Sequence, residues 1–208
     1  KVRGYNEELY LDALTGAYNR RYYEDRIRKV KSHAGVAMID LDDFKLYNDT
    51  LGHKVGDLVL RTVAEVIRSC IRKTDILIRY GGDEFILIMA DVELEIFTRK
   101  LKSISRKVQE AKVPGYPRLK MSVSIGGVMS EGDTIEEAIS RADHFMYMAK
   151  NKKNMVVTEE NSTGGKLEGR KEKFFEDLRP KILIIDDSEM NRAILREVLG
   201  EEFAVLEA

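Results

Sequence analysis

Three acidic residues follow two β-rich runs of the sequence, and their types and spacing could support chemistry on a nucleotide. Asp40 ends an apolar run, and Asp83 and Glu84 come directly after a glycine pair. Oxygen ligands without His or Cys favour Mg²⁺ or Mn²⁺ over Zn²⁺, and such sites usually share the cation with substrate phosphates. A single acid at a strand end is more often simply solvated. Three acids on neighbouring strands would instead form a cation site.

The glycine pair, Gly81 and Gly82, separates two β-rich runs at residues 76–80 and 85–90. Glycine accepts the positive φ of tight turns, so the pair predicts a hairpin tip that carries the two following acids. A tip without side chains also lets the backbone approach a bulky substrate closely. A purely structural turn is the alternative, because many hairpins use glycine in this way.

The remaining periodicity predicts elements that alternate in the α/β manner. We expect helices over residues 20–31, 57–71, 93–112 and 134–151, a loop at 32–35, and further strands over 36–41, 120–128 and 155–157. The stretch 158–169 is polar and contains glycine, which is typical of a linker.

Composition limits the class of protein. The chain has 208 residues, 43% hydrophobic and 34% charged, which suits one domain and a fragment better than two domains. The 35 basic and 36 acidic residues nearly cancel, so no global field would draw the chain onto a nucleic-acid polymer or an anionic membrane. Cys70 is the only cysteine, and no apolar run reaches the roughly 20 residues that span a bilayer. We expect a cytoplasmic protein without membrane insertion, and an N-terminus typical of a piece of a longer chain.

The segment GGDEF at Gly81 to Phe85, together with DLDDFKLYNDTLGHKVGD at Asp40 to Asp57, resembles the GGDEF family of diguanylate cyclases. The similarity runs over residues 12–157. It implies an α+β sandwich with a palm-like, ferredoxin-like core, in which helices flank a central antiparallel sheet. It also implies the condensation of two GTP into cyclic di-GMP and two pyrophosphates. Residues 1–11 resemble the family's signalling helix, 158–180 would be a linker, and 181–208 would be a separate fragment.

The resemblance assigns the acids to two Mg²⁺ or Mn²⁺ ions per active site. Asp40 and Asp83 match the family's metal ligands, the Leu41 carbonyl matches a backbone ligand, and Glu84 is a further carboxylate nearby. Two cations can lower the pKa of the attacking 3′-hydroxyl and balance the charge of the leaving pyrophosphate. Either Asp83 or Glu84 would take the hydroxyl proton.

Asn48 and Asp57 match the positions that bind guanine in the family. A carboxylate can accept from N1–H and the exocyclic amine of guanine, whereas adenine presents an acceptor at N1. Mismatches of this kind discriminate by roughly 10⁴-fold, which favours GTP over ATP. The structural alternative is that Asp57 caps the helix that we expect to begin there.

Phe44 and Lys45 resemble the turn over the triphosphate, and Lys45 and Lys150 supply positive charge. A lone lysine is usually solvated surface. After Lys150 this chain has one residue fewer than the common family pattern. The second phosphate-binding base is therefore Lys153, with Lys152 as the alternative.

Arg72 and Asp75, in RKTD, stand where the family places its RxxD product-inhibition site. Arg72 could bond guanine O6 and N7 of cyclic di-GMP as a fork. The structural alternative is a surface ion pair worth a few tenths of a kcal/mol. Arg99 and Arg106 are candidates for a second arginine supplied by a neighbouring subunit.

The tail sequence KILIIDDSEMNR, with a strand at Ile182 to Ile185 followed by Asp186 and Asp187, resembles the start of a response-regulator receiver domain. The strand that carries the phosphoacceptor is missing, so we do not expect this chain to be phosphorylated. An ordinary strand followed by acids is the alternative. A βαβ fragment this short, below about 40 residues, would not close a domain alone.

The reaction joins two GTP with two-fold symmetry, so we expect a C2 homodimer with facing active sites. Two other classes of function compete with the enzyme. One is a catalytically silent GGDEF module that binds GTP or cyclic di-GMP as an effector, and the other is an interaction scaffold. The intact acids favour the enzyme.

Overall fold

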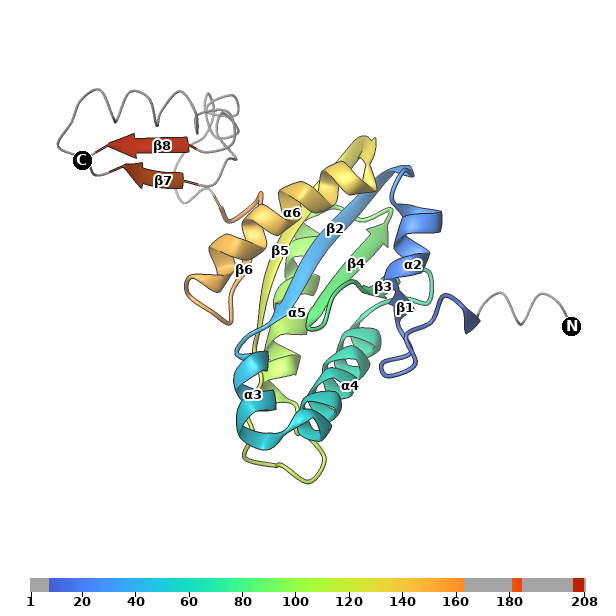
Figure 1. Cartoon of the computed structure of the whole chain (residues 1–208). Helices are drawn as coiled ribbons and strands as arrows, with labels where there is room; N and C mark the ends of the chain where they lie inside the picture. The colour runs from blue at the N-terminus through green and yellow to red at the C-terminus, as the bar shows by residue number, and fades with distance from the viewer. Residues whose placement is uncertain (1–7, 163–180, 185–203, 208) are drawn as a thin grey trace, which may run out of the picture. The chain divides into compact units, whose positions relative to one another are not determined.

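A six-stranded mixed sheet forms the centre of the first of two units, residues 1–162, into which the chain divides. The structure is a computed structural model, and it describes residues 8–162, 181–184 and 204–207. The strands follow the spatial order β1-β3-β4-β2-β5-β6 (Figure 1). Their bounds are β1 Tyr18–Asn19, β2 Lys31–Leu41, β3 Ile76–Arg79, β4 Glu84–Ala90, β5 Val123–Thr134 and β6 Val156–Thr158.

The four inner strands are antiparallel, as the sequence predicts. β2 pairs with β4 on one side and with β5 on the other, and β3 and β4 form the predicted hairpin. The edge pairs, β1 with β3 and β5 with β6, are parallel, so the complete sheet is mixed. This arrangement puts the end of β2 next to the start of β4, where the predicted acids lie.

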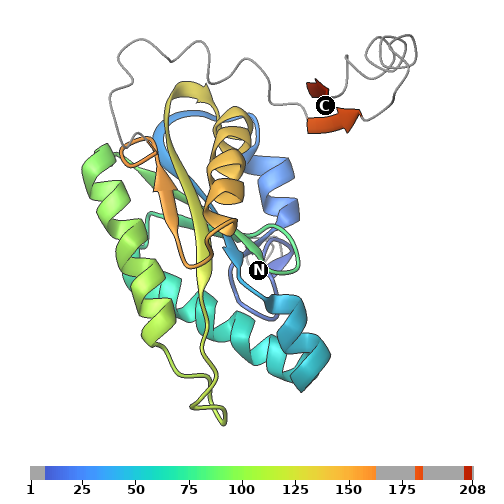
Figure 2. The same cartoon turned by 90° about the vertical axis from the view of Figure 1, so that its left-hand side faces the viewer.

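Helices cover both faces of the sheet. Their bounds are α2 Arg20–Tyr22, which continues as the π-helical turn η1 Tyr23–Ile27, α3 Phe44–Leu51, α4 His53–Cys70, α5 Leu94–Glu110 and α6 Ile135–Lys150. One apolar cluster joins α4 and α5 to one face, and a second joins α6 and η1 to the other. Figure 2 shows the sheet between α5 and α6. The α+β fold class is therefore confirmed.

The residues of β2 alternate between these two clusters. Ala37, Ile39 and Leu41 pack with α4 and α5, whereas Val36 and Met38 pack with α6. Successive side chains of a strand point to opposite faces, so Asp40 faces the α6 side of the sheet. Its position in the strand thus decides which helix can reach it.

The prediction of a loop at residues 32–35 is wrong, because β2 already begins at Lys31 and the preceding helix ends at Ile27. The small and polar residues here are typical of a loop, but tertiary contacts extend the strand. A Cβ at Gly35 would collide with the ring of Phe97 from α5. Glycine therefore serves close packing within a strand at this position.

The second unit contributes two short strands to the described residues. β7 Lys181–Ile184 pairs in parallel with β8 Ala204–Glu207. The strand expected at the start of this unit is present. Asp186, Asp187 and the predicted helix lie outside the described residues. The receiver-like identity of this unit stays a prediction.

No helix in the described parts of the chain is long and apolar enough to cross a membrane.

Candidate active site

The Asp40 carboxylate lies at the end of β2, opposite Glu84 of β4 and Ser124 of β5. It is 2% exposed. Lys150, the last residue of α6, reaches it from the helix that covers this face, with Nζ 2.8 Å from Asp40 Oδ2. The other carboxylate oxygen, Oδ1, is buried and has no hydrogen-bond partner among the described residues. The arrangement leaves an acid with one oxygen available to a ligand.

Burial raises the pKa of Asp40 to about 6. The hydrogen bond and positive charge of Lys150 lower it, and the neighbouring Asp83 and Glu84 raise it further. Burial lowers the pKa of Lys150. The hydrogen bond to Asp40 and the negative charges of the nearby acids raise it more, so the Lys150 pKa lies above its ordinary value. The lysine is therefore a stable cation within an acidic group.

The hairpin between β3 and β4 brings Asp83 and Glu84 to the end of β2. The Tyr80 and Gly81 N–H groups donate to the Glu84 carbonyl and close the turn. The Leu41 N–H donates to the Asp83 carbonyl at 3.2 Å, which joins the hairpin tip to β2. Gly82 is exposed, and a Cβ at Gly81 would collide with the Glu84 carboxylate. The structure thus brings together the three acids that the sequence singles out.

The donor set suits a hard cation, although the side chains do not yet converge on one point. Within the described residues, no three His, Cys, Asp or Glu side chains stand close enough together to hold a metal as they are. Lys150 holds Asp40, and Glu84 lies over the turn. The unpartnered Asp40 oxygen and the oxygen-only set nevertheless fit Mg²⁺ or Mn²⁺. Oδ1 is the Asp40 oxygen that such a cation would bind, because Lys150 contacts Oδ2.

The predicted phosphate-binding residues surround the turn between β2 and α3. Phe44 begins α3 and is half-buried, and Lys45 is exposed beside it. Lys153 Nζ lies 2.7 Å from Asp43 Oδ1, whereas the side chain of Lys152 makes no polar contact with the described residues. Of the two candidate lysines, Lys153 is therefore the one that lies at the turn.

The predicted guanine-binding residues lie on two consecutive helices that meet at Gly52. Asn48 belongs to α3, and its side chain lies directly over Gly56 of α4, where a Cβ would collide with it. Asp57 follows Gly56, is exposed, and has no polar partner in the described part of the chain. Because α4 begins at His53, Asp57 does not cap this helix, and the structural alternative for Asp57 is wrong. The Asp57 carboxylate therefore has no capping role in α4.

The RKTD segment forms a turn between α4 and β3. The Asp75 carboxylate accepts from the Arg72 N–H at 2.7 Å, and the Asp75 N–H donates to the Arg72 carbonyl. The two residues therefore interact through the Arg72 backbone, and the alternative of an ion pair between their side chains is wrong. Arg72 is exposed, and its guanidinium has no partner among the described residues. Arg99 and Arg106 lie on the exposed surface of α5, and Arg99 approaches Glu95 at 4.0 Å.

Sequence reasoning missed a set of contacts that hold the hairpin tip. Arg79, just before the turn, donates to the Gly82 carbonyl at 2.7 Å and forms an ion pair with Asp12 at 3.2 Å. Asp12 also accepts from the N–H and hydroxyl of Thr15. The sequence offers one signal, an arginine two residues before the glycine pair, but its partner Asp12 is 67 positions away.

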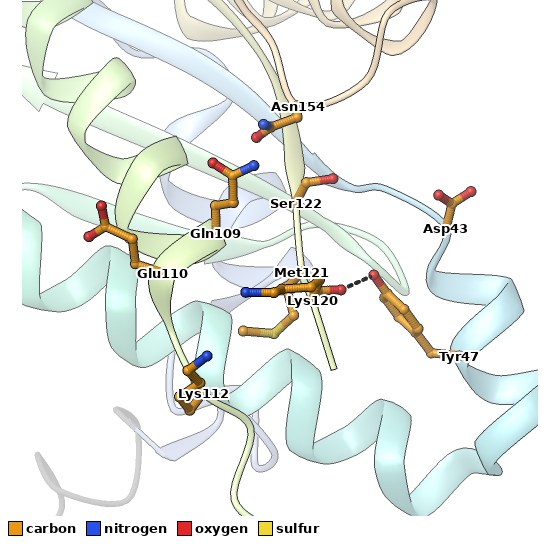
Figure 3. A pocket seen from close by; sticks show the side chains of 9 residues that line it. All are labelled: Asp43, Tyr47, Gln109, Glu110, Lys112, Lys120, Met121, Ser122 and Asn154. Carbon is orange, nitrogen blue, oxygen red and sulfur yellow. Dashed lines mark hydrogen bonds between the residues drawn. The ribbon is translucent and has the colours of Figure 1, made fainter. Parts of the chain in front are cut away.

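A pocket of about 720 Å³ lies beside the β2–α3 turn, with Asp43 of the turn in its lining (Figure 3). At one side of the pocket, the Tyr47 hydroxyl donates to the Lys120 carbonyl at 2.8 Å. The lining residues are Asp43, Tyr47, Gln109, Glu110, Lys112, Lys120, Met121, Ser122 and Asn154. None of the predicted nucleotide-binding residues belongs to this lining, but Lys153 adjoins it through its contact with Asp43.

Comparison with protein families matches residues 9–155 to "Diguanylate cyclase, GGDEF domain". The chain is 36% identical over 157 residues to the probable diguanylate cyclase DgcJ of Escherichia coli, covering 72% of this chain and 31% of DgcJ. It is 38% identical over 159 residues to the response regulator PleD of Caulobacter vibrioides, covering 70% and 35%. The chain thus spans about a third of the length of these curated relatives.

Solved structures share the fold. The GGDEF domain of DgcB from Caulobacter crescentus, in complex with c-di-GMP, superposes with a TM-score of 0.66 at 28% identity, covering 73% of this chain and 96% of that one. The diguanylate cyclase SiaD of Pseudomonas aeruginosa, in complex with its activator SiaC, gives 0.68 at 31% identity, covering 76% and 66%.

Proposed function

Since the chain belongs to the family of GGDEF diguanylate cyclase domains, we propose that it condenses two GTP into cyclic di-GMP and two pyrophosphates. The observation that carries this proposal is the buried Asp40 carboxylate, with an unpartnered oxygen, beside the GGDEF hairpin. Burying an acid in this way costs stability unless the site has a ligand to bind. The known relatives match the domain and support its type of chemistry.

The site residues divide the reaction between them. Asp40, Asp83, Glu84 and the Leu41 carbonyl would hold two Mg²⁺ or Mn²⁺ ions. Those ions supply Lewis-acid chemistry that activates the attacking 3′-hydroxyl and neutralises the leaving pyrophosphate. Asp83 or Glu84 accepts the hydroxyl proton as the new bond to the α-phosphorus forms and the bond to the β-phosphate breaks.

Binding of the nucleotide uses the two sides of α3. At its start, Phe44 and Lys45 offer backbone amides and charge to the triphosphate, together with Lys150 and Lys153. The Lys153 contact with Asp43 supports Lys153 rather than Lys152 as the second base. Asn48 and the exposed Asp57 carboxylate read the guanine edge. Gly81 and Gly82 leave room for the substrate at the hairpin tip.

Each chain offers one such site, so the productive form is a C2 homodimer. Specific activity should therefore rise with enzyme concentration. Product inhibition would use the free Arg72 guanidinium, with Asp75 shaping its turn and Arg99 or Arg106 coming from the neighbouring subunit. The buried Cys70 agrees with a cytoplasmic setting, which stays a prediction from the cysteine content.

A second candidate function is a silent module that binds GTP or cyclic di-GMP without turnover. Lys150, which already occupies one oxygen of Asp40, favours this alternative, as does the lack of any three acids among the described residues that could hold a metal as they stand. Two measurements distinguish the candidates. Mass spectrometry after incubation with GTP and Mg²⁺ detects cyclic di-GMP only if the enzyme is active. Calorimetric binding of GTP without product formation would instead identify the silent module.

A further inference from the structure

Asp42 is a buried carboxylate that the proposed chemistry does not use. It follows β2 directly and is 4% exposed. Its oxygens accept from the Ser122 hydroxyl at 2.6 Å, the Ser124 hydroxyl at 2.7 Å and the Asn154 N–H at 2.8 Å. These donors lie 80 to 112 positions away in the sequence. One side chain therefore ties the turn before α3 to the start of β5 and to the segment after α6.

The segment after α6 adopts an unfavourable backbone conformation. Lys153 and Asn154 have positive φ angles of 53° and 48°. Lysine rarely adopts this region, whereas asparagine does so more readily, so the Lys153 backbone in particular needs support from its surroundings. The Asn154 N–H bond to Asp42 is one such restraint, and a weak contact from the Ser105 hydroxyl to the Asn154 side chain, at 3.4 Å, is another.

The next residue on each segment makes a second link. Lys153, just before Asn154, places Nζ 2.7 Å from the carboxylate of Asp43, just after Asp42. The buried hydrogen bond thus fixes the backbone, while the exposed ion pair only orients the lysine tip. Exposed ion pairs contribute little by themselves, whereas hydrogen bonds to a buried charge are strong. The position of Lys153 therefore depends mainly on Asp42.

We infer that Asp42 is a positioning residue for the triphosphate of GTP: it binds the Asn154 N–H and so keeps Lys153 beside the phosphate turn. The inference rests on the proposed function of the site. Asp42 is buried and its oxygens already accept from three donors, so it acts through Lys153 and does not touch the substrate itself.

The test compares two ligands of the full chain. A GTP analogue with a methylene between the α- and β-phosphates reports base and phosphate binding, and guanosine reports base and ribose binding alone. Asp42→Asn keeps the shape of the side chain but removes its charge. We expect Asp42→Asn to weaken binding of the analogue about tenfold, the size of one charge-assisted hydrogen bond, and to change guanosine binding less than about twofold.

Asp133→Asn is the matched control. Asp133 lies near the far end of β5. Its carboxylate accepts hydrogen bonds from the Ser130 hydroxyl at 2.6 Å and from the Glu131 N–H at 3.0 Å, and it also contacts Arg141. Its loss should lower thermal stability without changing the preference for the triphosphate. Lys153→Ala should weaken analogue binding as much as Asp42→Asn, and the double variant should lose little more, since both act through one contact.

Two outcomes would contradict the positioning role of Asp42, and a third would contradict the phosphate site itself. Equal weakening of both ligands in Asp42→Asn, or full additivity with Lys153→Ala, would mean that Asp42 is only structural. A wild-type chain that binds the analogue no better than guanosine would overturn the phosphate site and this inference with it. Hydrogen exchange of the wild-type chain gives a test that needs no variant. The Asn154 amide should exchange slowly, and fast exchange there would contradict the inference.

Discussion

Lys150 Nζ lies 2.8 Å from the buried Asp40 carboxylate, so a residue expected to bind phosphate neutralises a residue expected to bind a cation. The two partners come from opposite ends of the domain sequence and meet because Asp40 faces the α6 side of the sheet. A triphosphate that binds Lys150 would release the second Asp40 oxygen, so that both carboxylate oxygens become available to a cation. Cation and triphosphate should bind more tightly together than either alone.

Removing the Lys150 charge should increase the affinity of the nucleotide-free chain for Mn²⁺. In Lys150→Met the Asp40 carboxylate has lost its counter-charge, so the cation no longer competes with the ammonium. We expect a gain of about 3- to 10-fold in Mn²⁺ affinity, measured by electron paramagnetic resonance, on the scale of a partly exposed charge pair. Lys152→Met, which removes a nearby lysine without such a contact, should change nothing. Equal Mn²⁺ affinity in wild type and Lys150→Met would contradict this account.

The raised pKa of Asp40 makes stability depend on pH in a definite direction. The folded chain holds this proton up to about pH 6, whereas an unfolded aspartate releases it near the ordinary aspartate pKa of 3.8. The folded state therefore binds more protons in this window, and its stability falls as pH rises through it. Asp40→Asn lacks this charge, so its stability relative to wild type should increase with pH, by up to about 3 kcal/mol. Denaturation at pH 4 and pH 7.5 measures this difference, and a constant difference would contradict the assignment.

The hairpin itself was predictable because its signals are local. The Gly81–Gly82 pair between two β-rich runs predicts the turn, and the acids after it follow directly. The Asp42 contacts could not be read in the same way, because all three donors lie at least 80 positions away. Strand residues 32–35 were missed for a related reason: their composition is typical of a loop, but packing of Phe97 against Gly35 extends β2.

The boundary of α4 illustrates the limit of capping rules. Asp57 has the residue type of an N-cap, yet the helix begins four residues earlier at His53, directly after Gly52. The short separation between α3 and α4 is not visible in the apolar periodicity. The predicted functional role of Asp57 is independent of this error, since its carboxylate remains exposed.

Arg79→Ala should impair turnover while leaving the fold intact. The Arg79 side chain is the contact that joins the Gly82 carbonyl to Asp12, so its loss frees the hairpin tip from the N-terminal loop. We expect a decrease in kcat of about 10- to 100-fold, since small misplacements of reacting groups have effects of this size. Arg79→Lys should not rescue it, because an ammonium cannot bond both partners as a fork. Normal kcat in Arg79→Ala would exclude a positioning role.

Arg72→Ala should leave turnover unchanged and weaken product inhibition about 10-fold or more, because the fork to guanine is lost. A titration of cyclic di-GMP into the reaction measures this. The control is Lys73→Ala, which removes a neighbouring charge without the fork. Inhibition that is unchanged in Arg72→Ala would rule out the RKTD segment as the inhibitory site.

The central claim is that the acids around Asp40 form an active site rather than a silent binding site. Its most direct test is mass spectrometry of wild-type and Asp83→Ala chains after incubation with GTP and Mg²⁺ at equal concentration. We predict cyclic di-GMP from the wild type and a decrease of at least about 100-fold in Asp83→Ala, on the scale of losing a general base or a cation ligand. Equal amounts of cyclic di-GMP from the two chains, or none from the wild type, would contradict the claim.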